Sequence, residues 1–172
     1  MMENTTKIGY HFVPADYKTF DFKALLDEYT QNNGTILWRT GSVGGARAHK
    51  FNVGDVCYFY YSNLPDRTSR ILLKGTVVES DTDKNCTENK FSYDENTKGF
   101  RVGDIQSVAL NQPEKFGMQT LCNKYFVSDG KPKQINQAQR YLDGYKELLN
   151  DLLADDDKTP LAEVVAYFKK QQ

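Results

Sequence analysis

The run Val56–Ser62, Val-Cys-Tyr-Phe-Tyr-Tyr-Ser, most constrains the fold because it is almost wholly apolar or aromatic. Alternate residues of a strand point to opposite faces of a sheet, so a strand without polar alternation has to be covered on both faces. Branched and aromatic side chains are also those that strands favour. The run therefore predicts a central strand with other layers of the chain packed on each side of it.

The chain of 172 residues is long enough to supply those layers within one domain. Its 11 Tyr and 10 Phe exclude a disordered chain and predict an aromatic core. Lys and Arg number 22 against 23 Asp and Glu, so a chain-wide positive field for nucleic acid is absent. No apolar run approaches the roughly 20 residues of a membrane helix, and the start has no hydrophobic signal core. We expect a cytoplasmic protein without a membrane partner.

Further apolar runs predict the other strands, of which the first is expected to stop at Pro14. Gly75 predicts a bulge or a close approach of two backbones within its strand. The strands expected beside the central one span residues 8–13, 35–40, 70–79, 100–110 and 119–127.

Three segments have apolar residues at helical spacing. The first runs from an Asp21 N-cap to Asn32-Asn33-Gly34, the second spans 134–153, and the third begins with Thr159 as N-cap and Pro160 as its first residue. The order of elements predicts an α+β fold, a small barrel or strongly curved sheet flanked by helices, with two C-terminal helices.

Catalysis lacks its usual residues in this sequence. The two histidines, His11 and His49, lie in different segments, and no metal-binding motif is present. The three cysteines are widely spaced, and Cys57 lies in the apolar run, where burial makes a thiol inert. Residues 155–157, three aspartates, are interpreted as a solvated helix junction. We expect a binding protein without cofactor or metal, and not an enzyme.

The segment 41–50, Gly-Ser-Val-Gly-Gly-Ala-Arg-Ala-His-Lys, has three glycines and no acidic residue. It is not a nucleotide-hydrolysing phosphate loop, because Ala46-Arg47 follow the last glycine where Lys and a hydroxyl residue are required. Glycine backbone beside Arg47 and Lys50 would still approach phosphate oxygens closely. The alternative is a tight turn between two strands.

Aromatic residues flank this segment in the sequence. Trp38 closes the strand before it, and Tyr60 and Tyr61 close the strand after it. If those strands pair, the three rings and the basic segment converge at one end of the sheet, where stacking of a base would contribute roughly 1–3 kcal/mol. Alternation puts Tyr60 and Tyr61 on opposite faces, so only one of them would line a pocket. The alternative is that all three rings belong to the core.

These features together resemble the PUA-like superfamily, and within it the EVE-type branch. The resemblance covers roughly residues 8–80. It rests on Trp38, the glycine-rich basic segment, the Val53-Gly54-Asp55 turn, the aromatic strand ending in Tyr61-Ser62-Asn63, and Lys74-Gly75-Thr76-Val77-Val78. Residues 131–142 are similar to the segment that follows such domains in modification-dependent restriction endonucleases of the HNH type.

The resemblance implies a PUA-like fold over residues 1–130, with 131–172 as a helical extension packed on it. It also implies a non-catalytic reader that accepts a flipped, modified base, with modified cytosine in DNA as the first expectation. A nuclease or other partner protein would then do the cutting. By position, the base pocket would comprise Trp38, Ser42, Tyr60, Tyr61, Ser62 and Asn63, and the phosphate contacts Arg39, Arg47, His49 and Lys50.

Two other functions remain open at this stage. PUA-like domains serve both polymers, so an RNA-binding module would share the fold. A protein-interaction module would instead dock a partner on the amphipathic C-terminal helices. An exposed apolar stripe on residues 135–153 would favour the second alternative, and a basic patch around Trp38 would favour a nucleic-acid reader.

Overall fold

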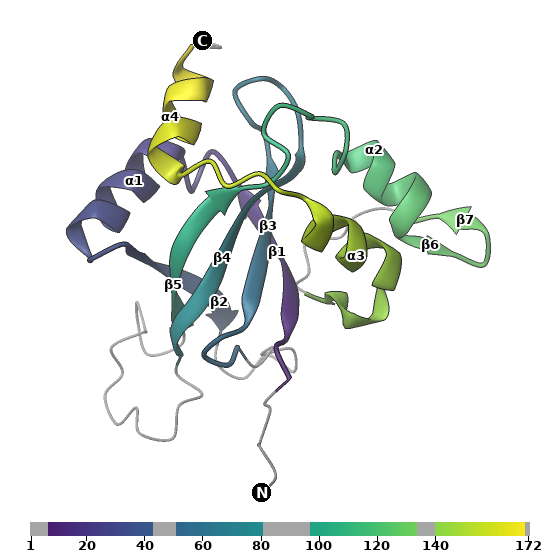
Figure 1. Cartoon of the computed structure of the whole chain (residues 1–172), viewed down its shortest axis with the longest axis horizontal. Coiled ribbons are helices and arrows are strands. Elements are labelled where there is room, and N and C mark those ends of the chain that lie inside the picture. The colour runs from purple at the N-terminus through teal and green to yellow at the C-terminus, as the bar shows by residue number, and fades with distance from the viewer. Residues whose placement is uncertain (1–6, 43–50, 81–96, 134–139, 171–172) are drawn as a thin grey trace, which may run out of the picture.

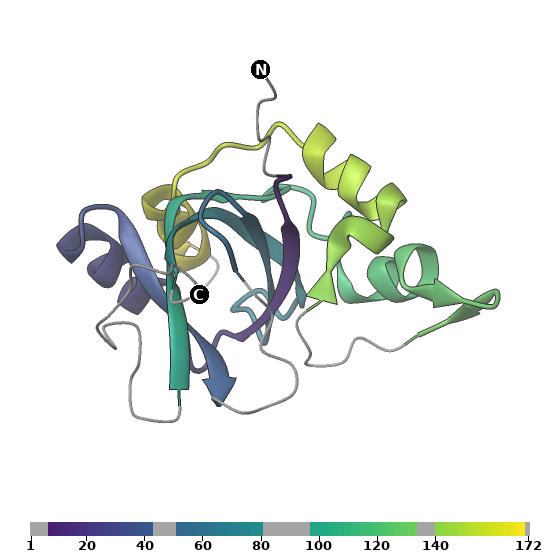
Figure 2. The same ribbon diagram turned by 90° about the horizontal axis from the view of Figure 1, so that it is seen from below.

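The fold is built on one strongly curled sheet (Figure 1). The computed structural model describes residues 7–42, 51–80, 97–133 and 140–170. Five long strands and the short β8 lie in the order β2-β5-β4-β3-β1-β8, and only β1 and β3 pair in parallel. Seen from below, the sheet forms a half-barrel (Figure 2). Its strands are β1 (Tyr10–Asp16), β2 (Thr35–Ser42), β3 (Val56–Ser62), β4 (Arg70–Ser80), β5 (Thr97–Ser107) and β8 (Arg140–Tyr141).

Helices cover both faces of this sheet. The two longest elements on one face are α1 (Phe22–Gln31) and α4 (Leu161–Lys169), which contact each other. The other face holds α2 (Met118–Thr120), the π-helical turn η1 (Leu121–Tyr125), the 3-10 turn η2 (Leu142–Gly144) and α3 (Lys146–Ala154). A separate small hairpin is formed by β6 (Val127–Ser128) and β7 (Lys131–Pro132).

Two hydrophobic clusters lie back to back across the sheet. We call the side with α1 and α4 the α4 face, and the side with η1 and α3 the α3 face. Strand β3 supplies both clusters with alternate residues, which confirms the predicted central strand covered on both sides. The α4 face contains Val13, Phe22, Trp38, Phe59, Tyr61, Phe100, Leu161, Val164 and Phe168, among others. The α3 face contains Phe12, Tyr58, Tyr60, Ile71, Leu121, Phe126, Leu148 and Leu152.

Three local predictions are confirmed in detail. Asp21 caps α1, since its Oδ1 accepts a hydrogen bond of 2.8 Å from the backbone N–H of Ala24. After Asn32, the residues Asn33 and Gly34 have positive φ and turn the chain into β2. A Cβ at Gly75 would clash with a methyl carbon of Val102 on β5, so this glycine allows the close approach of the two strands.

The first strand does not stop at Pro14 as the sequence suggested. Strand β1 continues to Asp16, and Pro14 pairs with Tyr60 of β3. Strand β8 covers the outer side of β1 only at His11 and Phe12. Within the described residues, Pro14 therefore lies on an open edge, where a missing N–H costs no ladder hydrogen bond.

The C-terminal third differs more from prediction. The strand expected over 119–127 is wrong, because residues 118–125 are helical, with Leu121 buried and Gln119 and Asn123 exposed. The helix expected over 134–153 begins only at Lys146, since Tyr141 pairs with His11 in the sheet. Residues 134–139 lie outside the described residues. The last helix has Pro160, not Thr159, as its N-cap.

Candidate functional site

The glycine-rich basic segment follows the end of β2, which lies at one end of the half-barrel. Here β2 ends, β4 ends, and β1, β3 and β5 begin, as the strand registers require. We call it the loop end (lower part of Figure 1). The chain leaves β2 here for residues 43–50 and returns at Phe51. Three of the predicted phosphate contacts, Arg47, His49 and Lys50, lie outside the described residues.

A buried histidine–carboxylate pair lies at the loop end. His11 Nε2 is 2.8 Å from Asp55 Oδ2, and the two residues are 1% and 4% exposed. Asp55 also accepts hydrogen bonds of 3.0 Å from the backbone N–H groups of Gly9, at Oδ1, and Asn52, at Oδ2. The carboxylate thus joins the start of β1 to the turn that precedes β3. Cys57 lies just beyond, and complete burial, with Asp55 nearby, raises the pKa of its thiol, as expected for an inert cysteine.

Aromatic rings continue from this pair into the half-barrel. The His11 ring lies 4.8 Å from Tyr141 and 4.5 Å from Phe51. Phe51 stacks on Phe100 with ring centroids 4.0 Å apart and an angle of 15°. The hydroxyl of Ser80 donates a hydrogen bond to the Phe51 carbonyl and ties the end of β4 to the same place. Tyr141 is 40% exposed, so the row of rings reaches the surface beside β8.

Trp38 belongs to the same row. It pairs with Phe100 across the β2–β5 ladder and is only 2% exposed. Phe20 stacks on its ring at 4.6 Å and 24°, and Phe59 contacts it at 4.4 Å and 48°. Phe20 is half-buried and lies in the turn before α1. In the described conformation, therefore, Trp38 is a core residue whose stacking face is taken by Phe20.

The strands that flank the basic segment do not pair, which corrects the expected convergence. Strand β2 pairs with β5, and β3 pairs with β1 and β4. Strand β3 starts at the loop end, so its last residues lie at the opposite end of the sheet, about 20 Å away for seven residues at ~3.3 Å each. The prediction that placed Tyr60 and Tyr61 beside the basic segment is therefore wrong.

The six predicted pocket residues are consequently not brought together. Tyr60 lies on the α3 face and Tyr61 on the α4 face, which confirms their opposite orientation. Both are buried, and burial raises the pKa of each phenol. Ser62 donates to the carbonyl of Ala15 over 3.2 Å, and the side-chain amide of Asn63 donates to Asp16 over 3.2 Å. Both hydrogen bonds lie at the end opposite to the loop end.

Arg39 and Ser42 are placed only by their backbone. Both lie in the last half of β2, where the register shifts between Arg39 and Gly41, and Ser42 pairs with Thr97 at the start of β5. Their side chains lie outside the described structure. Ser42 thus ends β2 at the loop end, on the same strand as Trp38.

Sequence reasoning missed the part that His11, Phe51, Asp55 and Tyr141 play in this site. The signal for Asp55 was the Val-Gly-Asp turn, and His11 was noted only as an isolated histidine. Their contact depends on parallel pairing of β1 with β3, which aligns His11 with Cys57. Parallel neighbours are joined by a crossover, here residues 17–55, so no local spacing reports them.

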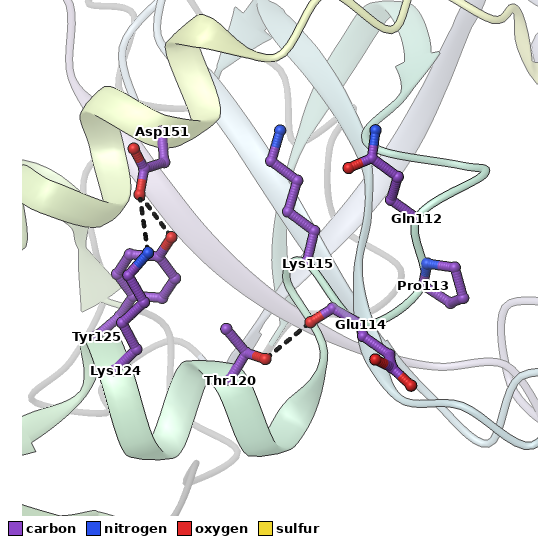
Figure 3. A pocket seen from close by; sticks show the side chains of 8 residues that line it. All are labelled: Gln112, Pro113, Glu114, Lys115, Thr120, Lys124, Tyr125 and Asp151. Carbon is purple, nitrogen blue, oxygen red and sulfur yellow. Dashed lines mark hydrogen bonds and ion pairs between the residues drawn. The ribbon is translucent and has the colours of Figure 1, made fainter.

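A hollow of about 630 Å³ lies away from the loop end, between α3 and the helical segment 118–125 (Figure 3). Within it, Asp151 Oδ2 accepts a hydrogen bond of 2.6 Å from the Tyr125 hydroxyl and lies 3.8 Å from Lys124 Nζ. Burial and this hydrogen bond raise the pKa of Tyr125. Lys115 forms an ion pair of 3.7 Å with Asp155, so both cations of the hollow are neutralised. Its lining comprises Gln112, Pro113, Glu114, Lys115, Thr120, Lys124, Tyr125 and Asp151.

In the part of the chain that the structure describes, no three His, Cys, Asp or Glu side chains are grouped so that they would hold a metal ion. Likewise, none of the helices in the described ranges has the length and apolar character needed to cross a membrane.

Comparison with known proteins gives no family. No family description matches the chain, and no curated protein matches it. Solved structures similar to it include a protein from Pseudomonas syringae, with 17% identity over 83% of this chain and 98% of that chain and a TM-score of 0.46. A protein from Leishmania major has 15% identity over 86% and 96%, with a TM-score of 0.48. One from Pseudomonas putida has 16% identity over 83% and 98%, with a TM-score of 0.44.

Proposed function

We propose that this chain is a non-catalytic, PUA-like reader of nucleic acid that takes up a flipped, modified base at the loop end, with modified cytosine in DNA as the base. The observation that supports this best is the row of rings on the α4 face. It runs from Trp38 on β2 through Phe100 and Phe51 to His11, and Phe51 directly follows the glycine-rich basic segment in the chain. Aromatic faces beside positive charge are what binding of an extruded base requires.

Room for the base comes from the neighbours of Trp38. Phe20 stacks on the indole as a base would, at 4.6 Å, and is half-buried in a turn rather than held in a strand. Phe59 is 1% exposed within the central strand and is held from both sides. A base that stacks on Trp38 therefore replaces Phe20 and leaves Phe59 in place.

The same mechanism assigns a role to the buried pair. Asp55 orients His11 through the Nε2 contact, and His11 in turn packs on Phe51. Since Phe51 directly follows the basic segment, the pair fixes the point at which that segment rejoins the sheet. His11 and Asp55 are positioning residues in this proposal and do no chemistry on the base.

Binding to matched duplexes tests the proposal directly. The duplexes differ only in whether one cytosine is unmodified, methylated or hydroxymethylated, and each is measured at low and moderate salt. Trp38 is the single tryptophan, so its fluorescence reports the stacking site alone. We expect selective binding to one modified duplex that survives added salt, with a change in Trp38 fluorescence at the same concentrations.

Two conservative variants separate stacking from general loss of packing. Trp38→Phe shortens the stacking surface, whereas Phe168→Leu alters the same cluster at α4. We expect Trp38→Phe to reduce the preference for the modified duplex at least several-fold and Phe168→Leu to keep it, both with native circular dichroism. Weak, salt-sensitive binding that is equal for all three duplexes would contradict a base pocket. Absence of binding to any DNA or RNA duplex would overturn the whole proposal.

No observation favours the docking alternative. Leu148 and Leu152 of α3 are 0% and 1% exposed and pack on the chain's own sheet. Within residues 140–154, Leu153 is the large apolar side chain of α3 that remains exposed, at 52%. The helix therefore lacks the continuous apolar stripe that a docking partner would need.

A further inference from the structure

The β6–β7 hairpin projects from the body of the protein as an arm. We define the arm as residues 126–133; it is the part farthest from α1 in both views (Figures 1 and 2). Its turn residues Asp129 and Gly130 have φ of 55° and 74°, the geometry of a two-residue turn that matches the twist of its strands. The arm is thus a defined hairpin.

The base of the arm is anchored in the α3-face core. The backbone N–H of Lys133 donates to the Phe126 carbonyl over 3.1 Å and closes the hairpin. The Phe126 ring is 2% exposed and meets Phe12 edge-on at 5.5 Å and Tyr145 edge-on at 4.9 Å. A projection held in this way loses little conformational entropy when it binds a partner.

The arm and the helical segment before it carry more positive than negative side chains, although Lys124 is paired with Asp151. Residues 118–133 contain three lysines, Lys124, Lys131 and Lys133, and one acidic residue, Asp129, while the whole chain carries a net charge of −1. All three lysines are exposed. Lys131 and Lys133 have no ion-pair partner among the described residues. Lys131 begins β7 and Lys133 directly follows this strand, so both charges are carried by the arm.

We infer that the arm contacts the phosphate backbone of the nucleic acid, with Lys131 and Lys133 as the phosphate-binding residues. This inference rests on the proposed function and adds a second contact, separate from the loop end. Lysine neutralises phosphates as a point charge without reading bases. The arm would therefore add affinity and orientation, equally for modified and unmodified duplexes.

Salt dependence distinguishes this role from a structural one. The double variant Lys131→Gln with Lys133→Gln removes both charges, and Lys169→Gln with Lys170→Gln removes two exposed charges from the end of α4, away from the arm. Binding of each protein to duplex DNA and to duplex RNA of the same sequence is measured over a series of salt concentrations. Thermal unfolding by circular dichroism checks that both variants fold like the parent chain.

We expect the arm variant to reduce the slope of log affinity against log salt by about one per lysine, about two in total, and the α4 variant to leave it unchanged. The ratio of affinities for modified and unmodified duplex stays as in the parent. If the slope is reduced with just one of the two polymers, the arm contacts that polymer. A parent chain that discriminates the modified base with an unaltered slope in the arm variant overturns the arm contact alone. A parent chain that binds neither polymer overturns both proposals.

Discussion

At the scale of single residues, Asp55 carries the largest number of buried polar contacts at the loop end. Its two oxygens serve three donors, the backbone N–H groups of Gly9 and Asn52 and the ring of His11. The His11 contact is buried, and the hydrogen bonds from Gly9 and Asn52 are partly buried. A carboxylate with two acceptor oxygens satisfies this arrangement, whereas an amide of the same shape has one acceptor.

Asp55→Asn is therefore expected to destabilise the protein although it preserves the size of the side chain. Whichever way the amide is turned, its NH₂ group faces another donor, and an unsatisfied buried donor costs about 1–3 kcal/mol. Urea unfolding at neutral pH measures the loss. The control is Asp129→Asn, which also removes one carboxylate but lies exposed at a positive-φ turn position that Asn tolerates. Equal unfolding free energies for both variants would contradict the proposed role of Asp55.

At the scale of elements, residues 155–159 between α3 and α4 are hydrogen-bonded to the end of β5 and the residues after it, and are not a solvated junction. We call residues 155–159 the clip. Asp157 Oδ2 accepts hydrogen bonds from the Ser107 hydroxyl, at 2.6 Å, and from the Leu110 N–H, at 2.8 Å. Its Oδ1 accepts from the N–H and the hydroxyl of Thr159. Asp155 accepts from the N–H of Ala109. The interpretation of the three aspartates as a solvated run is thus wrong for Asp155 and Asp157, because they satisfy donors at the end of β5.

The clip predicts a dependence of stability on pH. Partial burial alone would raise the pKa of Asp157, but the hydrogen bonds from Ser107, Thr159 and Leu110 outweigh it and lower the pKa from 3.8 to about 2. A folded-state pKa below the unfolded one means that the contribution is complete above about pH 5 and is lost as pH falls toward 2. Asp157→Asn should lower the free energy of unfolding by about 1–2 kcal/mol at pH 7, and the difference from the parent should shrink between about pH 4 and pH 2.

Urea unfolding of parent and variant at a series of pH values measures this difference. The neighbouring Asp156→Asn is the matched control, since Asp156 is exposed. A difference for Asp157→Asn that stays constant down to pH 2 would exclude the ionised carboxylate as the origin of the stabilisation.

Elements whose sequence carries its own local signal were predictable, and elements defined by tertiary contacts were not. Strand β3 has a dense apolar run, and helix α1 has an N-cap residue at its start and residues that favour positive φ just after its end. Residues 118–125 do have apolar residues at helical spacing, which the strand interpretation overlooked: Met118, Leu121, Cys122 and Tyr125. Tyr141 fits a helical stripe by spacing, yet its pairing with His11 draws it into the sheet.

At the scale of the molecule, the order of the strands in the sheet decides which residues meet at the loop end. Local sequence patterns do not reveal that order. The sequence indicated that the basic segment directly follows the strand of Trp38, and β2 does extend past Trp38 to Ser42. The sequence could not indicate that β5 and β4 intervene between β2 and β3. The curl of the sheet then brings Trp38 against Phe59 of β3 without pairing of their strands.

The shared sheet also couples the two hydrophobic clusters. Neighbouring residues of β3 enter opposite clusters, Tyr58 on the α3 face and Phe59 on the α4 face. A cavity in one cluster therefore weakens the strand that holds the other. We expect the two faces to unfold in one transition, with Trp38 fluorescence reporting the α4 face and far-ultraviolet circular dichroism the whole chain.

Leu148→Ala on α3 tests this coupling from the side remote from Trp38. Leu148 is 0% exposed, and its truncation should cost about 2–5 kcal/mol of unfolding free energy. The urea midpoint should fall by the same amount whether it is followed by Trp38 fluorescence or by circular dichroism, with the same slope. Leu153→Ala, on the same helix but 52% exposed, should change the midpoint little. Separate transitions for the two probes in Leu148→Ala would mean that each face folds on its own, and that the α3 face is an independent layer added to the sheet.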